Sequence, residues 1–394
     1  MAGTGSRLKA RAAGRLVLAG PLMTAWLFGA GQSVAGKAVT VNGPVPAGEL
    51  GVTLAHEHLL SDFRLPDERP ETWAASGRKQ PRTPEKVRLY NQPVAMSILG
   101  PLAMGEENRD NWLLDDEKTA VAELLEFKSF GGRTLVDLTT DGLKRDPQAL
   151  RRISEATGIH IVMGAGWYRR AWVGAGIDKL SAADLAKVLV REIQVGAGRT
   201  GIRAGIIGEL SPEDPDSDYD RKILQAAARA ARATGAPISL SIPLGRAEPR
   251  AILGSLDVLE SAGAALDRVA VGHADQIALD MPLMRRLLER GVYLQFDRLG
   301  DPPHVLTLVS DHDVALAVIA LLEAGFGGRV LLSQGVNSKI DLKAFGGSGY
   351  AFLLEQYAPY ARAIKPKGIT TDQMRMILTE NPRRLLAFAE PRED

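Results

Sequence analysis

An alternation of two kinds of segment begins near residue 50 and is the feature that most limits how this chain can fold. Short runs rich in Val, Ile and Leu are followed by turns and then by segments with helical periodicity. The runs show little polar alternation, which is typical of parallel strands buried on both faces. The expected strands cover residues 52–58, 134–140, 160–168, 204–210, 237–242, 269–274, 292–297 and 329–334.

The segments between these runs carry apolar residues at a spacing of three to four, as amphipathic helices do. Examples are the stripes Leu185/Leu189/Ile193, Leu283/Leu287/Leu288 and Leu316/Ile319/Leu322. Eight strands, seven intervening helices and a helical C-terminus predict an α/β fold, the (β/α)8 TIM barrel. A doubly wound sheet is the alternative, but it requires a GxGxxG fingerprint after the first strand, and none is present there.

Residues 59–115 interrupt the alternation with a polar, charged and proline-containing stretch. A loop of this length in a compact domain usually covers a functional site. Because it follows the first strand directly, we expect it to lie over the C-terminal end of that strand. We therefore predict that residues 36–394 form a single barrel domain with one long loop at 59–115.

The first 35 residues have the organisation of a secretory signal peptide. Basic residues precede an apolar run over 16–31, and Ser33, Val34 and Ala35 supply a cleavage site of small residues. An uncleaved anchor is the alternative, although Pro21 and the glycines shorten the run below the roughly 20 residues needed to span a bilayer. We expect removal of residues 1–35 and a periplasmic or secreted mature protein without a membrane segment.

Composition narrows the chemistry and the partners. The chain has no cysteine, which excludes disulfides, cysteine-bound metals and thiol nucleophiles. A transition metal therefore has to be held by the six histidines and by carboxylates or a modified lysine. The formal charge of +1 is spread without basic or acidic blocks, so we expect a small-molecule substrate rather than nucleic acid.

His56 and His58 are the strongest signal for a site. Residues two apart on a strand point to the same side, so both imidazoles can reach one metal ion at the mouth of the barrel. The alternative for an isolated H-x-H motif is a structural role, in which one histidine caps the end of the strand and the other packs in the core. Here the pair ends a buried strand, which favours the metal site.

Three more polar residues end other strands. Glu209 ends the fourth, His273 the sixth and Asp297 the seventh. A carboxylate in an apolar strand is costly unless it is paired or bound to a metal. Active sites of this fold are assembled from the C-terminal ends of several strands, so these residues predict one constellation. Each of them taken singly could be structural.

The other histidines receive different predictions. His160 begins the third strand, at the end of the barrel that serves stability. His304 and His312 follow the seventh strand, where surface or capping roles are expected, with substrate contact an option for His304.

From about Val39 to Phe388 these residues resemble the phosphotriesterase family of the amidohydrolase superfamily. The resemblance lies in many ordered segments. They are 51–58 (GVTLAHEH), 136–143 (VDLTTDGL), 161–168 (IVMGAGWY), 201–209 (GIRAGIIGE), 271–273 (VGH), 331–334 (LLSQ), 345–350 (FGGSGY) and 381–388 (NPRRLLAF).

The resemblance implies a metal centre, usually of two zinc ions. His56 and His58 would bind the inner ion, Glu209 would bridge both ions, and His273 would bind the outer one. The hydroxide activated by the metals would attack a phosphoryl or carbonyl centre. Two positions depart from the family, because Ser241 stands where it has a histidine and Gly335 where it has an aspartate. We therefore expect zinc or another divalent metal, with one ion favoured over two.

Two interpretations of the function follow. The first is a hydrolase of phosphoester, carboxylester or lactone bonds, with Glu209, His273 and Asp297 as catalytic residues and Tyr168, Asp297 and His304 as substrate contacts. The second is a degenerate relative that binds a small ligand without turnover, which Ser241 and Gly335 favour. The retained metal-binding residues favour the first. The resemblance also implies a possible homodimer.

Overall fold

The computed structural model describes residues 34–245, 247–302, 307 and 309–392. The predicted signal peptide lies almost wholly outside the described residues, and His304 lies outside them too. The described residues belong to one compact unit, which spans Ser33–Asp394. Within the described residues, no helix is both long and apolar enough to cross a membrane.

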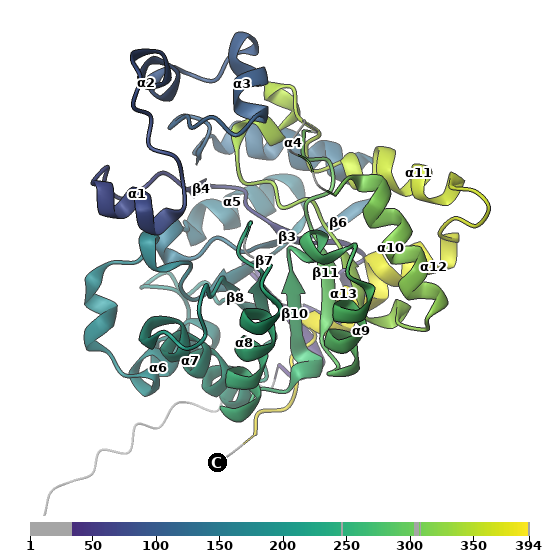
Figure 1. Cartoon of the computed structure of the whole chain (residues 1–394). Coiled ribbons are helices and arrows are strands. Elements are labelled where there is room, and N and C mark those ends of the chain that lie inside the picture. The colour runs from purple at the N-terminus through teal and green to yellow at the C-terminus, as the bar shows by residue number, and fades with distance from the viewer. Residues whose placement is uncertain (1–33, 246, 303–306, 308, 393–394) are drawn as a thin grey trace, which may run out of the picture. The chain divides into compact units, whose positions relative to one another are not determined.

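A parallel eight-stranded sheet forms the centre of this unit, which confirms the predicted barrel (Figure 1). Its strands are β3 (Val52–Glu57), β6 (Gly132–Asp137), β7 (His160–Ala165), β8 (Ile206–Leu210), β9 (Ile238–Ser241), β10 (Val269–Gly272), β11 (Tyr293–Phe296) and β12 (Val330–Leu332). Neighbours in the sheet follow chain order from β3 through β6 to β12. All eight runs are strands, although most are shorter than predicted because their last residues turn into the loops that carry the site.

Hydrogen bonds from the segment after β12 close the barrel against β3. The Ser333 hydroxyl accepts a hydrogen bond from the backbone N–H of His56 at 3.0 Å. The N–H of Gly335 donates to the carbonyl of His56 at 3.1 Å, and the N–H of His58 donates to the carbonyl of Val336 at 3.0 Å. The closing contacts therefore run along the segment that carries both histidines.

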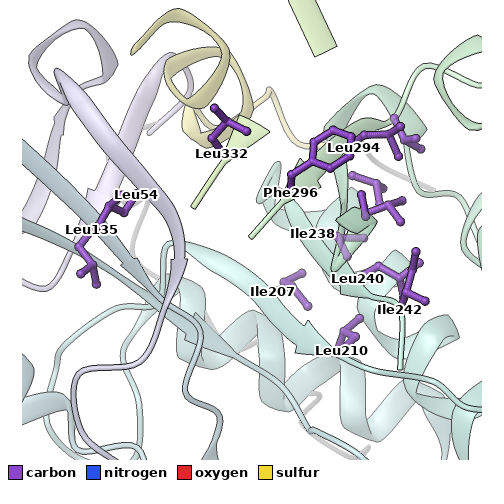
Figure 2. Close-up of a cluster of buried hydrophobic side chains, with 14 of the residues drawn as sticks. Leu54, Leu135, Ile207, Leu210, Ile238, Leu240, Ile242, Leu294, Phe296 and Leu332 are labelled. Carbon is purple, nitrogen blue, oxygen red and sulfur yellow. The ribbon is translucent and has the colours of Figure 1, made fainter. Parts of the chain in front are cut away.

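Helices follow the strands in turn and surround the sheet (Figure 1). They are α4 (Glu117–Ser129), α5 (Pro147–Thr157), α6 (Ala182–Gln194), α7 (Asp218–Thr234), α8 (Pro249–Ser261), α9 (Met281–Glu289), α10 (Asp311–Glu323), α11 (Ala358–Ala363), α12 (Thr371–Arg375) and α13 (Asn381–Leu386). Their inner faces and the strands share one apolar cluster, part of which Figure 2 shows. Leu185, Leu189 and Ile193 are buried on α6 as predicted, and the Ser181 hydroxyl caps that helix.

The stripe predicted on α10 is wrong at Leu316, which is 45% exposed. Ile319 and Leu322 are partly buried and pack against the apolar cluster, whereas the buried residues of this helix include Val314, Val318 and Leu321. This helix is apolar around most of its circumference, so spacing alone does not select the face that packs on the barrel.

The segment between β3 and α4 is also more ordered than a loop. It contains the short helices α1 (Pro70–Ser76), α2 (Pro84–Asn91) and α3 (Leu99–Ala103). Its ends pair as β4 (Ser61–Asp62) and β5 (Leu113–Leu114). A second addition to the prediction is the antiparallel pair β1 (Lys37–Thr40) and β2 (Gly43–Pro46), which precedes the barrel.

Asn381 fixes the C-terminal helix α13 to the barrel. The side chain is fully buried, and its amide donates to the carbonyls of Gly327 and Val330 at 2.8 and 2.7 Å. We expect Asn381→Ala to lower the free energy of unfolding by about 2–4 kcal/mol, because two buried carbonyls lose their donor. Urea denaturation measures the change.

The exposed Asn91 is a matched control, because its amide also donates to a carbonyl but at the surface. Asn91→Ala should stay within about 0.5 kcal/mol of the native protein. Equal stabilities of the two variants would contradict the role assigned to Asn381.

Candidate metal centre

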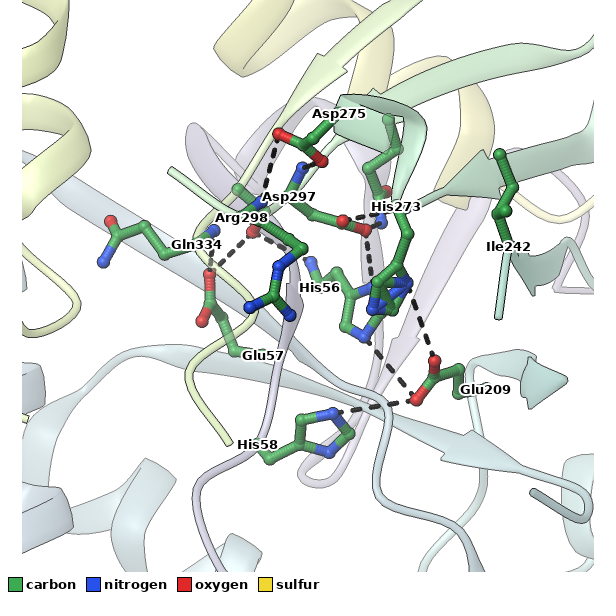
Figure 3. A network of polar contacts seen from close by, with 12 residues as sticks. His56, Glu57, His58, Glu209, Ile242, His273, Asp275, Asp297, Arg298 and Gln334 are labelled. Atoms are coloured by element: carbon green, nitrogen blue, oxygen red, sulfur yellow. Dashed lines mark hydrogen bonds and ion pairs between the residues drawn. The ribbon is translucent and has the colours of Figure 1, made fainter. Parts of the chain in front are cut away.

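His56, His58 and Glu209 converge at the C-terminal ends of β3 and β8 (Figure 3). The Nε2 atoms of His56 and His58 lie 3.7 and 3.8 Å from Oε2 of Glu209. The three residues are at most 2% exposed. Two strands that are distant in sequence thus present two imidazole nitrogens to one carboxylate oxygen.

His273 approaches the other oxygen of Glu209 from the end of β10. Its Nδ1 lies 3.9 Å from Glu209 Oε1, and neither atom has a hydrogen-bond partner. The backbone of His273 is left-handed, with φ of 55°. Such a conformation is uncommon outside glycine and is concentrated at functional sites.

The electrostatics of the four residues suit a cation. Burial opposes ionisation of Glu209, but the charge of His56 and the nearby His273 and His58 lower its pKa to about 2. Burial and the charge of His56 lower the pKa of His58 to about 3, so this ring is neutral at pH 7. Burial also lowers the pKa of His273. Burial works against protonation of His56, yet Asp297 and Glu209 raise its pKa well above the usual value.

These donors fit a divalent cation. Imidazole nitrogen and carboxylate oxygen bind zinc at about 2.0–2.2 Å, which places the donors of a tetrahedron roughly 3.4 Å apart. Donor atoms of His56, His58 and Glu209 lie within 4.8 Å of one another, as do those of His56, His273 and Asp297. An ion between the first three would also replace the positive charge that His56 carries against Glu209. The unpartnered atoms of Glu209 and His273 leave room for further coordination.

Asp297 follows β11 and lies behind His56, away from Glu209 (Figure 3). Its Oδ2 is 2.7 Å from Nδ1 of His56, and its Oδ1 accepts the backbone N–H of His273 at 2.8 Å. The carboxylate is fully buried. A direct contact of Asp297 with substrate stays a prediction; in this structure both oxygens of the carboxylate face donors from the protein.

The two departures from the family lie beside these residues. Ser241 pairs in register with Gly272, and its buried hydroxyl has no hydrogen-bond partner. Gly335 has φ of +60°, and a Cβ there would lie 2.4 Å from the carbonyl oxygen of Asp297. A side chain at 335 would therefore not fit without a shift of the backbone.

Supporting residues that the sequence did not reveal hold the histidines from outside. Thr139 Oγ1 lies 3.0 Å from Nδ1 of His58, and the Tyr350 hydroxyl donates to the carbonyl of His58 at 2.7 Å. The Glu57 carboxylate accepts the Ser333 hydroxyl and the N–H groups of Gln334 and Val336. Burial raises the pKa of Glu57 to about 7 in spite of these donors. The polar run around Thr139 and the glutamate between the two histidines were the available sequence signals.

Tyr168 belongs to an aromatic wall next to the histidines. The Phe63 ring lies edge-on to His58 at 5.0 Å, Tyr168 is 5.7 Å from Phe63, and Trp172 is 5.4 Å from Tyr168. The residues 59–115 thus contribute Phe63 directly beside a metal-site histidine. A substrate contact by Tyr168 stays a prediction.

Two of the remaining histidines belong to the described residues, and neither is within ion-pair distance of Glu209 or Asp297. His160 begins β7, as predicted, and is partly buried. His312 is exposed at the start of α10, and its Nδ1 lies 2.5 Å from the Tyr360 hydroxyl. A cavity of about 980 Å³ is lined by Asp275 and Arg298, but by none of His56, His58, Glu209 and His273. Asp275 accepts the N–H of Asp297 at 2.9 Å.

Comparison with known proteins shows the family of this chain and a similar relative. The model of the phosphotriesterase family matches residues 36–386. The N-acetyltaurine hydrolase of Homo sapiens is 34% identical over 365 residues, which cover 91% of this chain and 99% of the relative.

Two solved structures are similar as well. A resiniferatoxin-binding protein from Rhodobacter sphaeroides is 35% identical with a TM-score of 0.80, covering 89% of this chain and 95% of that one. A phosphotriesterase homology protein from Escherichia coli, complexed with phosphate in its active site, is 26% identical with a TM-score of 0.69. It covers 86% of this chain and 99% of that one.

Proposed function

Because this chain belongs to the phosphotriesterase family of hydrolases, we propose that it hydrolyses a small amide or ester with a divalent metal, zinc first among the candidates, held by His56, His58 and Glu209. The observation that carries the proposal is the position of Glu209. Its two oxygens lie 3.7–3.9 Å from ring nitrogens of three histidines that come from two other strands. One of those oxygens, Oε1, is buried without a hydrogen-bond partner.

A divalent ion bound there would supply Lewis-acid activation of water and of the scissile carbonyl. The side chains around the ion would supply its charge balance, its nitrogen ligands and an apolar surface for the substrate. Glu209 contributes a buried negative charge, and the neutral His58 ring offers its Nε2 lone pair to the same space. The aromatic wall of Phe63 and Tyr168 provides an apolar side on which an acyl group can pack.

For the substrate we place an N-acyl amide of a small acid first. The support is a relative that is 34% identical over nearly its whole length and is named for N-acetyltaurine. Carboxylesters, lactones and phosphoesters remain candidates, because the same activation serves all of these electrophiles. Export and a homodimer stay predictions.

The second candidate function is binding of a small ligand without turnover. Ser241 and Gly335 remove two family ligands, and a relative that is 35% identical is named for binding resiniferatoxin. In this case the cavity lined by Asp275 and Arg298 would hold the ligand.

A single panel of assays separates the two functions. The purified chain is analysed for metal and then assayed with N-acetyltaurine, p-nitrophenyl acetate, a lactone and a phosphotriester. We expect turnover of at least one carbonyl substrate that is lost with a chelator and restored by zinc. Stoichiometric metal without turnover of any substrate would contradict the hydrolase and favour the binding protein.

A further inference from the structure

A buried carboxylate other than Glu209 lies at the end of β11, beside the strand that Gly335 follows. Gly335 follows β12, where the resemblance places an aspartate. Asp297 follows β11, which is the sheet neighbour of β12. Glu209 and Asp297 are the two carboxylates that lie within 4 Å of histidine ring nitrogens in the described part of the chain.

Two glycines make the space that Asp297 occupies. A Cβ at Gly272 would lie 2.7 Å from Oδ2 of Asp297, so any other residue there would displace the carboxylate. A Cβ at Gly335 would lie 2.4 Å from the carbonyl oxygen of Asp297. The position of Asp297 therefore depends on the absence of side chains at both sites.

Every oxygen of the Asp297 carboxylate has a defined donor. Oδ1 accepts the backbone N–H of His273, and Oδ2 accepts the side-chain amide of Gln295 at 2.8 Å. Oδ2 also lies 2.7 Å from Nδ1 of His56. With Nδ1 of His56 engaged in this way, its Nε2 is left facing Glu209.

We propose that Asp297 is the positioning residue of this centre: it fixes His56 as the Nδ1–H tautomer, holds the backbone of His273, and places a buried negative charge behind both residues. A carboxylate behind a metal-binding histidine orients the ring and raises the basicity of its other nitrogen. The inference rests on the proposed metal centre but not on turnover.

The number of metal ions that the centre can hold follows from the charges and donors of its residues. Glu209 and Asp297 carry two negative charges, which balance one divalent ion held by neutral imidazoles. A second ion on the far side of Glu209 would have only Oε1 of Glu209 and the ring of His273 as donors among the four residues of the centre, which is fewer than the three protein ligands of a usual catalytic site. The centre therefore fits a single ion between His56, His58 and Glu209.

The first test uses Asp297→Asn. Both oxygens already accept N–H groups, so the amide nitrogen of asparagine must face a donor in either orientation. We expect zinc affinity, measured by competition with a chromogenic chelator, to fall about 10–100-fold. Gly272→Ala should act in the same direction with a smaller effect, because it crowds Oδ2 and leaves the carboxylate chemistry intact.

Asp220→Asn is the matched control. Asp220 is a buried carboxylate that accepts the backbone N–H groups of Glu213 and Asp214 and lies on α7, where it contacts no histidine. This variant should lose stability but bind zinc like the native chain. An equal loss of zinc affinity in both variants would overturn the proposal.

A second measurement needs no variant and no substrate. Nitrogen-15 NMR of the zinc-loaded native chain should show His56 with a proton on Nδ1 in a strong hydrogen bond. A proton on Nε2 of His56, or more than one tightly bound zinc per chain, would overturn the inference. If zinc and the tautomer agree but no substrate is turned over, the positioning role stands and the hydrolase proposal fails.

Discussion

Glu209→Gln is expected to abolish tight metal binding and to lower kcat/KM by at least about 10³-fold. The amide has nearly the shape of the carboxylate but lacks its charge, which faces three histidines in a site that is 2% exposed. Loss of the ion removes several kcal/mol of transition-state stabilisation, and each 1.36 kcal/mol corresponds to about a factor of ten. Metal analysis and steady-state kinetics with the best substrate of the panel measure both effects.

Glu123→Gln is the control for this variant. Glu123 is a buried glutamate of α4 that accepts the backbone N–H of Ala344 and contacts none of the centre's residues. Its replacement should leave the metal content unchanged. A Glu209→Gln protein that retains both zinc and activity would remove the basis of the proposed function.

Gly335→Asp is expected to reduce stability by about 2–4 kcal/mol and to give no gain in activity, although it restores the family's residue. The estimate combines a left-handed φ of +60° with a Cβ placed 2.4 Å from the carbonyl of Asp297. Adding the residue back would therefore displace Asp297, on which His56 depends. Thermal unfolding and the chelator competition assay measure the outcome.

Gly325→Asp separates the cost of the backbone conformation from the cost of the clash. Gly325 also has a positive φ, of +86°, but a Cβ there would meet nothing within 4 Å. This control should lose about 1 kcal/mol, because only the left-handed conformation is penalised. Higher zinc affinity in Gly335→Asp than in the native chain would show that the aspartate position is still available.

The barrel could be predicted from the sequence because strands buried on both faces leave a strong apolar signal. The same signal placed Glu209 and His273 at strand ends, since a polar residue at the end of such a run is conspicuous. The ends of the strands were predicted less accurately, because the last residues of each run are equally apolar whether they pair in the sheet or turn into a loop. Leu316 of α10 was assigned to the buried face for a related reason, since a helix that is apolar on most sides shows little difference in polarity between its faces.

The roles of side chains around the centre could not be predicted. Asp297 was predicted from its place at a strand end, but its contact with His56 was not, because the direction of its side chain depends on space left by Gly272. Tyr350 and Thr139 support His58 from segments far apart in sequence, and no local pattern indicates such contacts. Helices α1–α3 were missed because short helices in a polar segment carry weak periodicity.

The ring of strands is joined between its last and first members by bonds to His56, Glu57 and His58. The barrel is therefore closed at the residues that are proposed to bind the metal. A substitution that disrupts the segment after β12 would thus displace His56 and His58 directly, even if most helices kept their fold. Closure of the barrel and the geometry of the centre therefore depend on the same hydrogen bonds.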